Sequence, residues 1–191
     1  MAKSSGGVRG GGNRTSGLVV SLRKEENSIR NNTYETGIVL DSKGNVLLRK
    51  KGRAGSVEFN KSEVALMKDA IFTHNHPSAL TKQGVYRIGN AMSRADLVTA
   101  VSSNMQEMRA VTTAYTFIMR RPKKGWNATP SQVDRAVRQA EKKVREKMEV
   151  YIARYKGDER TAINRANVLR WNMVNREVAK KFGWIYKHHK G

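Results

Sequence analysis

The chain has 191 residues, with 37 Lys and Arg against 16 Asp and Glu, and a formal net charge of +21. It contains no cysteine, which excludes disulfide scaffolds, thiolate metal sites and cysteine nucleophiles. Any metal must therefore be held by His, Asp or Glu. The excess of positive charge favours a polyanionic partner, most often nucleic acid, because neutralised phosphates release condensed counterions. The alternative is a basic surface without a specific ligand.

No stretch approaches the ~18 apolar residues of a membrane span, and the first residues lack the apolar core of a secretory signal. We therefore expect a cytoplasmic protein that has no contact with a membrane. Residues 1–30 are basic and begin with a glycine-rich stretch in which, after Met1, Val8 is the only large apolar residue up to position 17. This composition predicts a flexible basic arm.

Apolar periodicity predicts regular elements from residue 33 onward. Strands are expected at 33–40, 46–50 and 71–73, helices from 60 and over 94–103, a long polar loop at 78–91, and one strand or a hairpin at 107–120. Apolar residues at three-and-four spacing then predict two long helices, at about 133–155 and 158–182. The expected fold class is α/β (α+β), with an arm at 1–30, a domain at 31–125 and a basic helical hairpin at 126–191.

Two of the four histidines are His74 and His76, at the end of the strand expected at 71–73 and followed by Pro77. Residues i and i+2 of a strand point to the same side, so both imidazoles can reach one point. Asp96, near the start of an expected helix, offers a third ligand. Two His and one Asp with an open fourth position are typical of a catalytic zinc site.

A hydrolytic site also needs a base, and Glu35 is the candidate, because its neighbours Ile38, Val39 and Leu40 are apolar and a buried carboxylate is costly. The base would take a proton from water and pass it to a leaving amine. Ser93, three residues before Asp96, could donate a hydrogen bond to the developing oxyanion.

Each of these residues has a simpler interpretation. A His-x-His pair is often a surface feature, and Glu35 could face solvent. Ser93 and Asp96 match a helix N-cap and its capping-box partner, a role compatible with the catalytic one. The letters His-Asn-His also suggest an HNH nuclease, although that motif is spread over a hairpin and a helix. His188 and His189 could bind metal, but a frayed basic tail is favoured.

The order Glu35, His74-Asn75-His76-Pro77 and Ser93-x-x-Asp96 resembles the JAMM motif of the JAB/MPN metallopeptidases, including RadC-like domains and those of phage and mobile-element proteins. The resemblance covers roughly residues 30–122. It implies a mixed sheet with flanking helices, with His74, His76 and Asp96 as zinc ligands. It also implies Glu35 as general base and Ser93 as oxyanion support.

The function expected from the resemblance is zinc-dependent hydrolysis of a peptide or isopeptide bond, in a phage or mobile-element protein of a bacterial cytoplasm. Residues 77–92, between the second histidine and Ser93, form a longer segment than in the family, which suggests a substrate-gating loop or a binding role. The alternative is a nucleic-acid-binding or virion-associated protein with a non-catalytic scaffold, and a third possibility is a metal-dependent hydrolase of nucleic acid. The basic arm and hairpin are the expected polyanion contacts, since residues 121–191 carry +12 of the charge.

Overall fold

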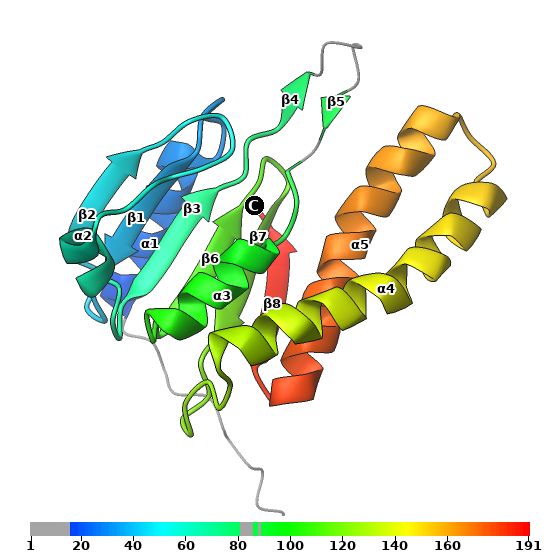
Figure 1. Ribbon diagram of the computed structural model, residues 1–191. Coiled ribbons are helices and arrows are strands. Elements are labelled where there is room, and N and C mark those ends of the chain that lie inside the picture. Colours follow the sequence, from blue (N-terminus) through cyan, green and yellow to red (C-terminus); the bar gives the residue numbers. More distant parts are fainter. Residues whose placement is uncertain (1–15, 81–85, 88) are drawn as a thin grey trace, which may run out of the picture.

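The computed structural model describes residues 16–80, 86–87 and 89–191. Its main sheet has six strands in the order β2-β1-β3-β6-β7-β8 (Figure 1). These strands are β1 (Thr36–Leu40), β2 (Val46–Lys51), β3 (Ile71–Asn75), β6 (Glu107–Val111), β7 (Tyr115–Arg120) and β8 (Ile185–Lys190). Strands β3 and β6 are parallel and all other neighbours are antiparallel. The expected α/β class with a mixed sheet is confirmed.

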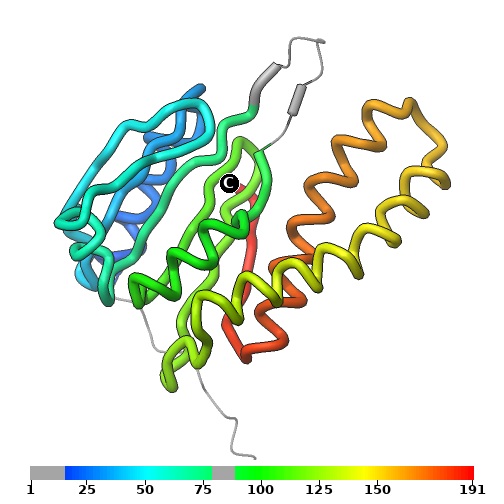
Figure 2. Tube along the Cα trace, viewed as in Figure 1, coloured from blue at the N-terminus to red at the C-terminus, as the bar shows by residue number. Residues whose placement is uncertain are grey.

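Helices cover the two faces of the sheet unequally. The helices are α1 (Ser16–Ile29), α2 (Lys61–Ala65), α3 (Arg94–Ser102), α4 (Pro130–Arg154) and α5 (Glu159–Phe182). Helix α1 lies on one face, behind the sheet in Figure 1, and α3 lies in front with the α4–α5 hairpin beside it. The predicted loop at 78–91 contains a small pairing of β4 (Ala79–Leu80) with β5 (Tyr86–Arg87), which projects from the sheet in Figure 1. Figure 2 traces the α4–α5 hairpin beside the sheet. Positions 81–85 and 88 of that loop lie outside the described residues.

Helix starts follow local sequence signals. The side chains of Asn60, Ser93 and Thr129 each accept a hydrogen bond from the backbone N–H three residues on. In each case the side chain of that later residue accepts a hydrogen bond from the backbone N–H of the capping residue. Such capping boxes satisfy two N–H groups that the helix leaves unpaired. Helix α5 ends at Gly183, whose φ of 70° is the left-handed conformation that favours glycine. The starts of α2 and α3 match the prediction, whereas α4 begins at Pro130, three residues before the predicted start at about 133.

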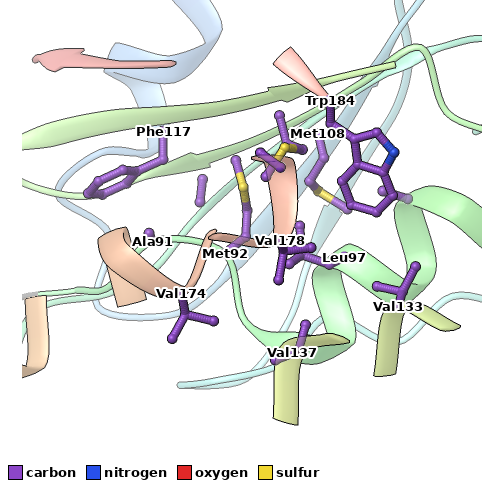
Figure 3. Packing of buried hydrophobic residues seen from close by; sticks show 14 of the residues in the cluster. Ala91, Met92, Leu97, Met108, Phe117, Val133, Val137, Val174, Val178 and Trp184 are labelled. Atoms are coloured by element: carbon purple, nitrogen blue, oxygen red, sulfur yellow. The ribbon is translucent and has the colours of Figure 1, made fainter. Parts of the chain in front are cut away.

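The main apolar core joins the sheet to α3 and to the helical hairpin. Figure 3 shows Met108 and Phe117 from the sheet facing Leu97 of α3, Val133 of α4 and Val178 of α5. The side chains of all five are almost fully buried. The predicted boundary at residues 125 and 126 therefore does not separate two cores, and the hairpin packs on the β-containing part.

The predicted flexible arm at 1–30 is wrong for residues 16–29, which form α1. Residues 1–15 lie outside the described residues. Helix α1 forms because its apolar side chains, spaced at helical intervals, cover the back of the first strands. This second core cluster comprises Leu18, Leu22, Ile29, Ile38, Leu40 and Ile71.

The predicted frayed tail at the end of the chain is also wrong. Residues Ile185–Lys190 form β8, which pairs antiparallel with β7, so that His188 lies opposite Phe117 and His189 opposite Thr116. Without β8, the backbone N–H and C=O groups on this side of β7 would be left unpaired. Backbone pairing therefore orders a segment whose side chains are mostly exposed.

The hairpin presents most of its charged side chains to solvent. Three of its cations form ion pairs with acids of the same hairpin: Arg138 with Asp134, Lys143 with Glu177, and Arg170 with Glu141. Contact between this surface and a polyanion stays a prediction. Across the part of the chain that the structure describes, no helix combines the length and apolar character needed to cross a membrane.

Candidate metal site

Three elements bring the candidate site together. Strands β1 and β3 pair antiparallel with Gly37 opposite His74. Continuing this register places Glu35, just before β1, opposite His76, just after β3. Asp96 comes from the first turn of α3. Residues 61 positions apart in sequence, from Glu35 to Asp96, therefore meet at one edge of the sheet.

The ligand atoms converge closely. The Nε2 atoms of His74 and His76 are 2.9 Å apart. The Asp96 carboxylate lies 3.4 Å from each histidine, through Oδ1 to His74 and through Oδ2 to His76. The Oε1 atom of Glu35 lies 3.9 Å from the Nε2 atom of His74. The ligand atoms of Glu35, His74 and His76 all lie within 4.8 Å of one another, so this buried group could hold a metal ion.

The ring of His76 is fixed by a hydrogen bond at its other nitrogen. Its Nδ1 lies 2.7 Å from the carbonyl oxygen of Asn90, and because a carbonyl only accepts, Nδ1 carries the proton. In the neutral imidazole this leaves the lone pair on Nε2, directed at the site, as is usual for a metal-ligating histidine. The ring of His74 instead stacks on Phe72 at 5.0 Å between centroids, and within the described residues its Nδ1 has no hydrogen-bond partner.

Ser93 holds Asp96 in place. The backbone N–H of Ser93 donates to Asp96 Oδ2 at 2.6 Å, and the Asp96 N–H donates to Ser93 Oγ at 3.2 Å. The predicted capping box is thus confirmed, and it points the carboxylate at the histidines. The role of Ser93 as an oxyanion donor stays a prediction.

Burial and charge shift the pKa values of the site in opposite directions. Burial raises the pKa of Glu35, and the nearby histidines only partly offset it. Burial would also raise the pKa of Asp96, but the charges and hydrogen bonds of His74 and His76 hold it well below its usual range. Burial would lower the pKa of His76, yet Asp96 outweighs it and raises the value to about 9. Without a metal, the site thus holds its charge as a His76–Asp96 ion pair.

Asn75, between the two histidines, has a role that the sequence interpretation missed. Its fully buried side chain accepts from the Thr36 N–H at 2.7 Å and donates to the Tyr34 carbonyl at 2.9 Å. These bonds hold the backbone on both sides of Glu35. The consecutive His-Asn-His letters therefore combine two site residues with a positioning residue. No local signal in the sequence indicates this role, because the partners of Asn75 lie about 40 positions away.

Replacing Asn75 by leucine is expected to lower the free energy of unfolding by about 2–3 kcal/mol, because two buried backbone groups lose their partners. Urea denaturation measures the loss. The exposed Asn167 of α5 is the matched control, and its replacement by leucine should change stability by less than about 0.5 kcal/mol. A loss of the same size in both variants would contradict the bracing role.

Two glycines allow close packing around the histidines. A Cβ on Gly37 would lie 2.8 Å from the ring of Phe72, on which His74 stacks. A Cβ on Gly89 would lie 2.1 Å from the carbonyl oxygen of His76. Both contacts are too short to be tolerated, so a larger residue at position 37 would displace the Phe72 ring, and one at position 89 would displace the backbone of His76.

The helical hairpin also reaches the site. Asn175 of α5 is fully buried and donates to the carbonyl of Met92 at 2.9 Å, directly before Ser93. The start of α3, and with it Asp96, is therefore held from α5 as well as from the sheet. The basic hairpin is part of the structure that supports the candidate site.

The fold and the site define a mixed α/β protein in which the buried group of Glu35, His74 and His76 could hold a metal ion. No family model matches the chain, and no curated protein or solved structure matches it either. The resemblance to the JAB/MPN metallopeptidases therefore stays a prediction from the motif residues and their order.

Proposed function

We propose that the protein is a zinc-dependent hydrolase of the JAMM type that cleaves a peptide or isopeptide bond. One observation carries this proposal: the imidazoles of His74 and His76 and the carboxylate of Asp96 face one point, with the Glu35 carboxylate beside them. Burying ionisable groups is costly, and groups gathered around one largely buried point are typical of functional sites.

The donor set fits zinc. Zinc binds His nitrogen and carboxylate oxygen at about 2.0–2.2 Å in tetrahedral geometry, which separates neighbouring ligand atoms by about 3.3–3.5 Å. Asp96 lies 3.4 Å from both histidines, at this separation. The 2.9 Å between His74 and His76 is shorter, so these rings would move apart slightly around the ion. The fixed Nδ1 proton of His76 leaves its Nε2 available for the metal.

The residues divide naturally into ligands and base. Zinc bound by His74, His76 and Asp96 would supply a Lewis acid that polarises a carbonyl and activates water. Glu35 lies farther from His74 than Asp96 does, at 3.9 Å against 3.4 Å, and its carboxylate makes no hydrogen bond to any residue that the structure describes. It is thus available to take a proton from the attacking water and deliver it to the leaving amine. Burial raises its pKa and increases its basicity.

Metal content tests the proposal directly. The protein, purified without a histidine affinity tag, is expected to hold about one zinc per chain by elemental analysis. A His74→Ala/His76→Ala variant is expected to hold none, because the carboxylates of Glu35 and Asp96 cannot by themselves complete a zinc site. His188→Ala/His189→Ala is the matched control, since it removes two histidines of β8 and should keep the zinc. The proposal fails if wild type takes up no zinc after incubation with excess metal, or if the His74/His76 variant keeps it while folded.

A further inference from the structure

The opposite face of the sheet carries a second concave feature, a pocket of about 600 Å³ between α1 and strands β6–β8. Helix α1 covers the first strands on this face and leaves part of the later ones open. The pocket is distinct from the metal site, because Arg109 and Arg120 alternate with the core residues Met108 and Met119 and so point to the other side of the sheet. Its charged lining residues are Arg23, Glu26, Arg30, Arg109, Arg120 and Lys190.

Acidic groups neutralise only part of this positive charge. Arg109 forms ion pairs with Glu26 and Glu107, and Arg120 pairs with Glu107. Two carboxylates therefore balance two guanidiniums. The other cations of the lining, Arg23, Arg30 and Lys190, have no carboxylate within ion-pair distance among the described residues. The pocket retains a surplus of positive charge.

Arg30 is the most informative of these cations. Its Nη1 donates to the Thr112 carbonyl at 2.5 Å and its Nη2 to Thr116 Oγ1 at 3.0 Å, so neutral oxygens hold the guanidinium. Its Nε is buried and has no partner among the described residues. Burial lowers the pKa of Arg30, and the charge of Glu26 offsets this only in part. A partly buried cation with no carboxylate at ion-pair distance is costly, and a bound anion would offset that cost.

The pKa of the neighbouring His189 is affected by the same positive charges. Burial lowers the pKa of His189, and the charges of Arg109, Arg30 and Arg23 lower it further against the opposing effect of Glu26. His189 lines the pocket from β8. An anion placed among these groups would meet an attractive field.

We propose that this pocket binds a phosphate group. Guanidinium groups match phosphate oxygens by paired hydrogen bonds, and a pocket within about 300–1,000 Å³ accommodates a ligand of nucleotide size. The phosphate could belong to a free phosphorylated small molecule or to the backbone of a nucleic-acid strand, and both sources present the same chemistry. The inference is independent of the proposed hydrolase, because it uses the other face of the sheet.

The test compares two double variants that each lose two positive charges. Arg23→Gln/Lys190→Gln removes two exposed cations of the pocket, whereas Lys24→Gln/Lys68→Gln removes two exposed cations outside it. Arg30 is left intact because it joins the end of α1 to the β6–β7 connection. The probes are pyrophosphate, followed by calorimetry, and a labelled single-stranded oligonucleotide of about 12 nucleotides, followed by fluorescence anisotropy.

The pocket variant is expected to weaken binding at least about tenfold, and the control variant to leave it within about twofold of wild type. Pyrophosphate binding at about one per chain with this pattern supports a small phosphorylated ligand. Oligonucleotide binding with this pattern, and no measurable pyrophosphate binding, supports a nucleic-acid strand. If neither probe binds wild type, or if both variants bind alike, the proposal is overturned.

Discussion

Replacing Glu35 by glutamine is expected to reduce hydrolysis by about 10²–10⁴-fold and to leave about one zinc per chain in place. Glutamine has nearly the same shape as glutamate but cannot accept the proton of the attacking water. In the proposed mechanism, His74, His76 and Asp96 hold the ion without help from Glu35. Activity and metal content therefore separate in this variant.

The experiment follows cleavage of a library of peptides and lysine isopeptides by mass spectrometry, together with zinc content by elemental analysis. Glu58→Gln is the matched control, since Glu58 is exposed and should keep both activity and zinc. Loss of zinc from Glu35→Gln would instead make Glu35 a ligand, as its place in the Glu35, His74 and His76 group also permits. Full activity in Glu35→Gln would contradict its role as the base.

The second large effect concerns stability. Replacing Arg109 by methionine is expected to lower the free energy of unfolding by about 3–5 kcal/mol. Arg109 is buried, and its guanidinium donates to Glu26 through Nε and to Glu107 Oε1 through Nη1 at 2.6 Å. Burial alone would lower the pKa of Arg109, but both carboxylates outweigh it and raise the value. In the variant, Glu26 would lose its ion pair with Arg109. Glu107 would lose the same partner and keep its ion pair with Arg120.

Urea denaturation at neutral pH measures this loss, which would be a large part of the 5–15 kcal/mol typical of a domain. Arg138→Met is the matched control: its ion pair with Asp134 lies on the exposed face of α4 and should contribute less than about 1 kcal/mol. A triple variant, Glu26→Leu/Arg109→Met/Glu107→Leu, should recover much of the lost stability, because it leaves no buried carboxylate of this network. Equal losses in Arg109→Met and Arg138→Met would contradict the prediction.

Much of the candidate site could be predicted because its determinants are local. The alternation of a strand puts His74 and His76 on one side, whatever the rest of the chain does. The capping box of Ser93 and Asp96 fixes a helix start within four residues. What local pattern could not supply was the bracing by Asn75, whose bonds reach residues about 40 positions away in sequence.

The same division holds for the fold. Local patterns predicted the strands β1, β2 and β3 and the long helices α4 and α5, since periodicity and turn residues act over a few residues, but they left residues 107–120 open between one strand and a hairpin. Contacts between distant parts of the chain make residues 16–29 a helix and residues 185–190 a strand. Helix α1 depends on apolar surface offered by distant strands, and β8 on the open edge of β7. Both elements are stabilised by burial and backbone pairing with distant residues, and local composition does not predict such contacts.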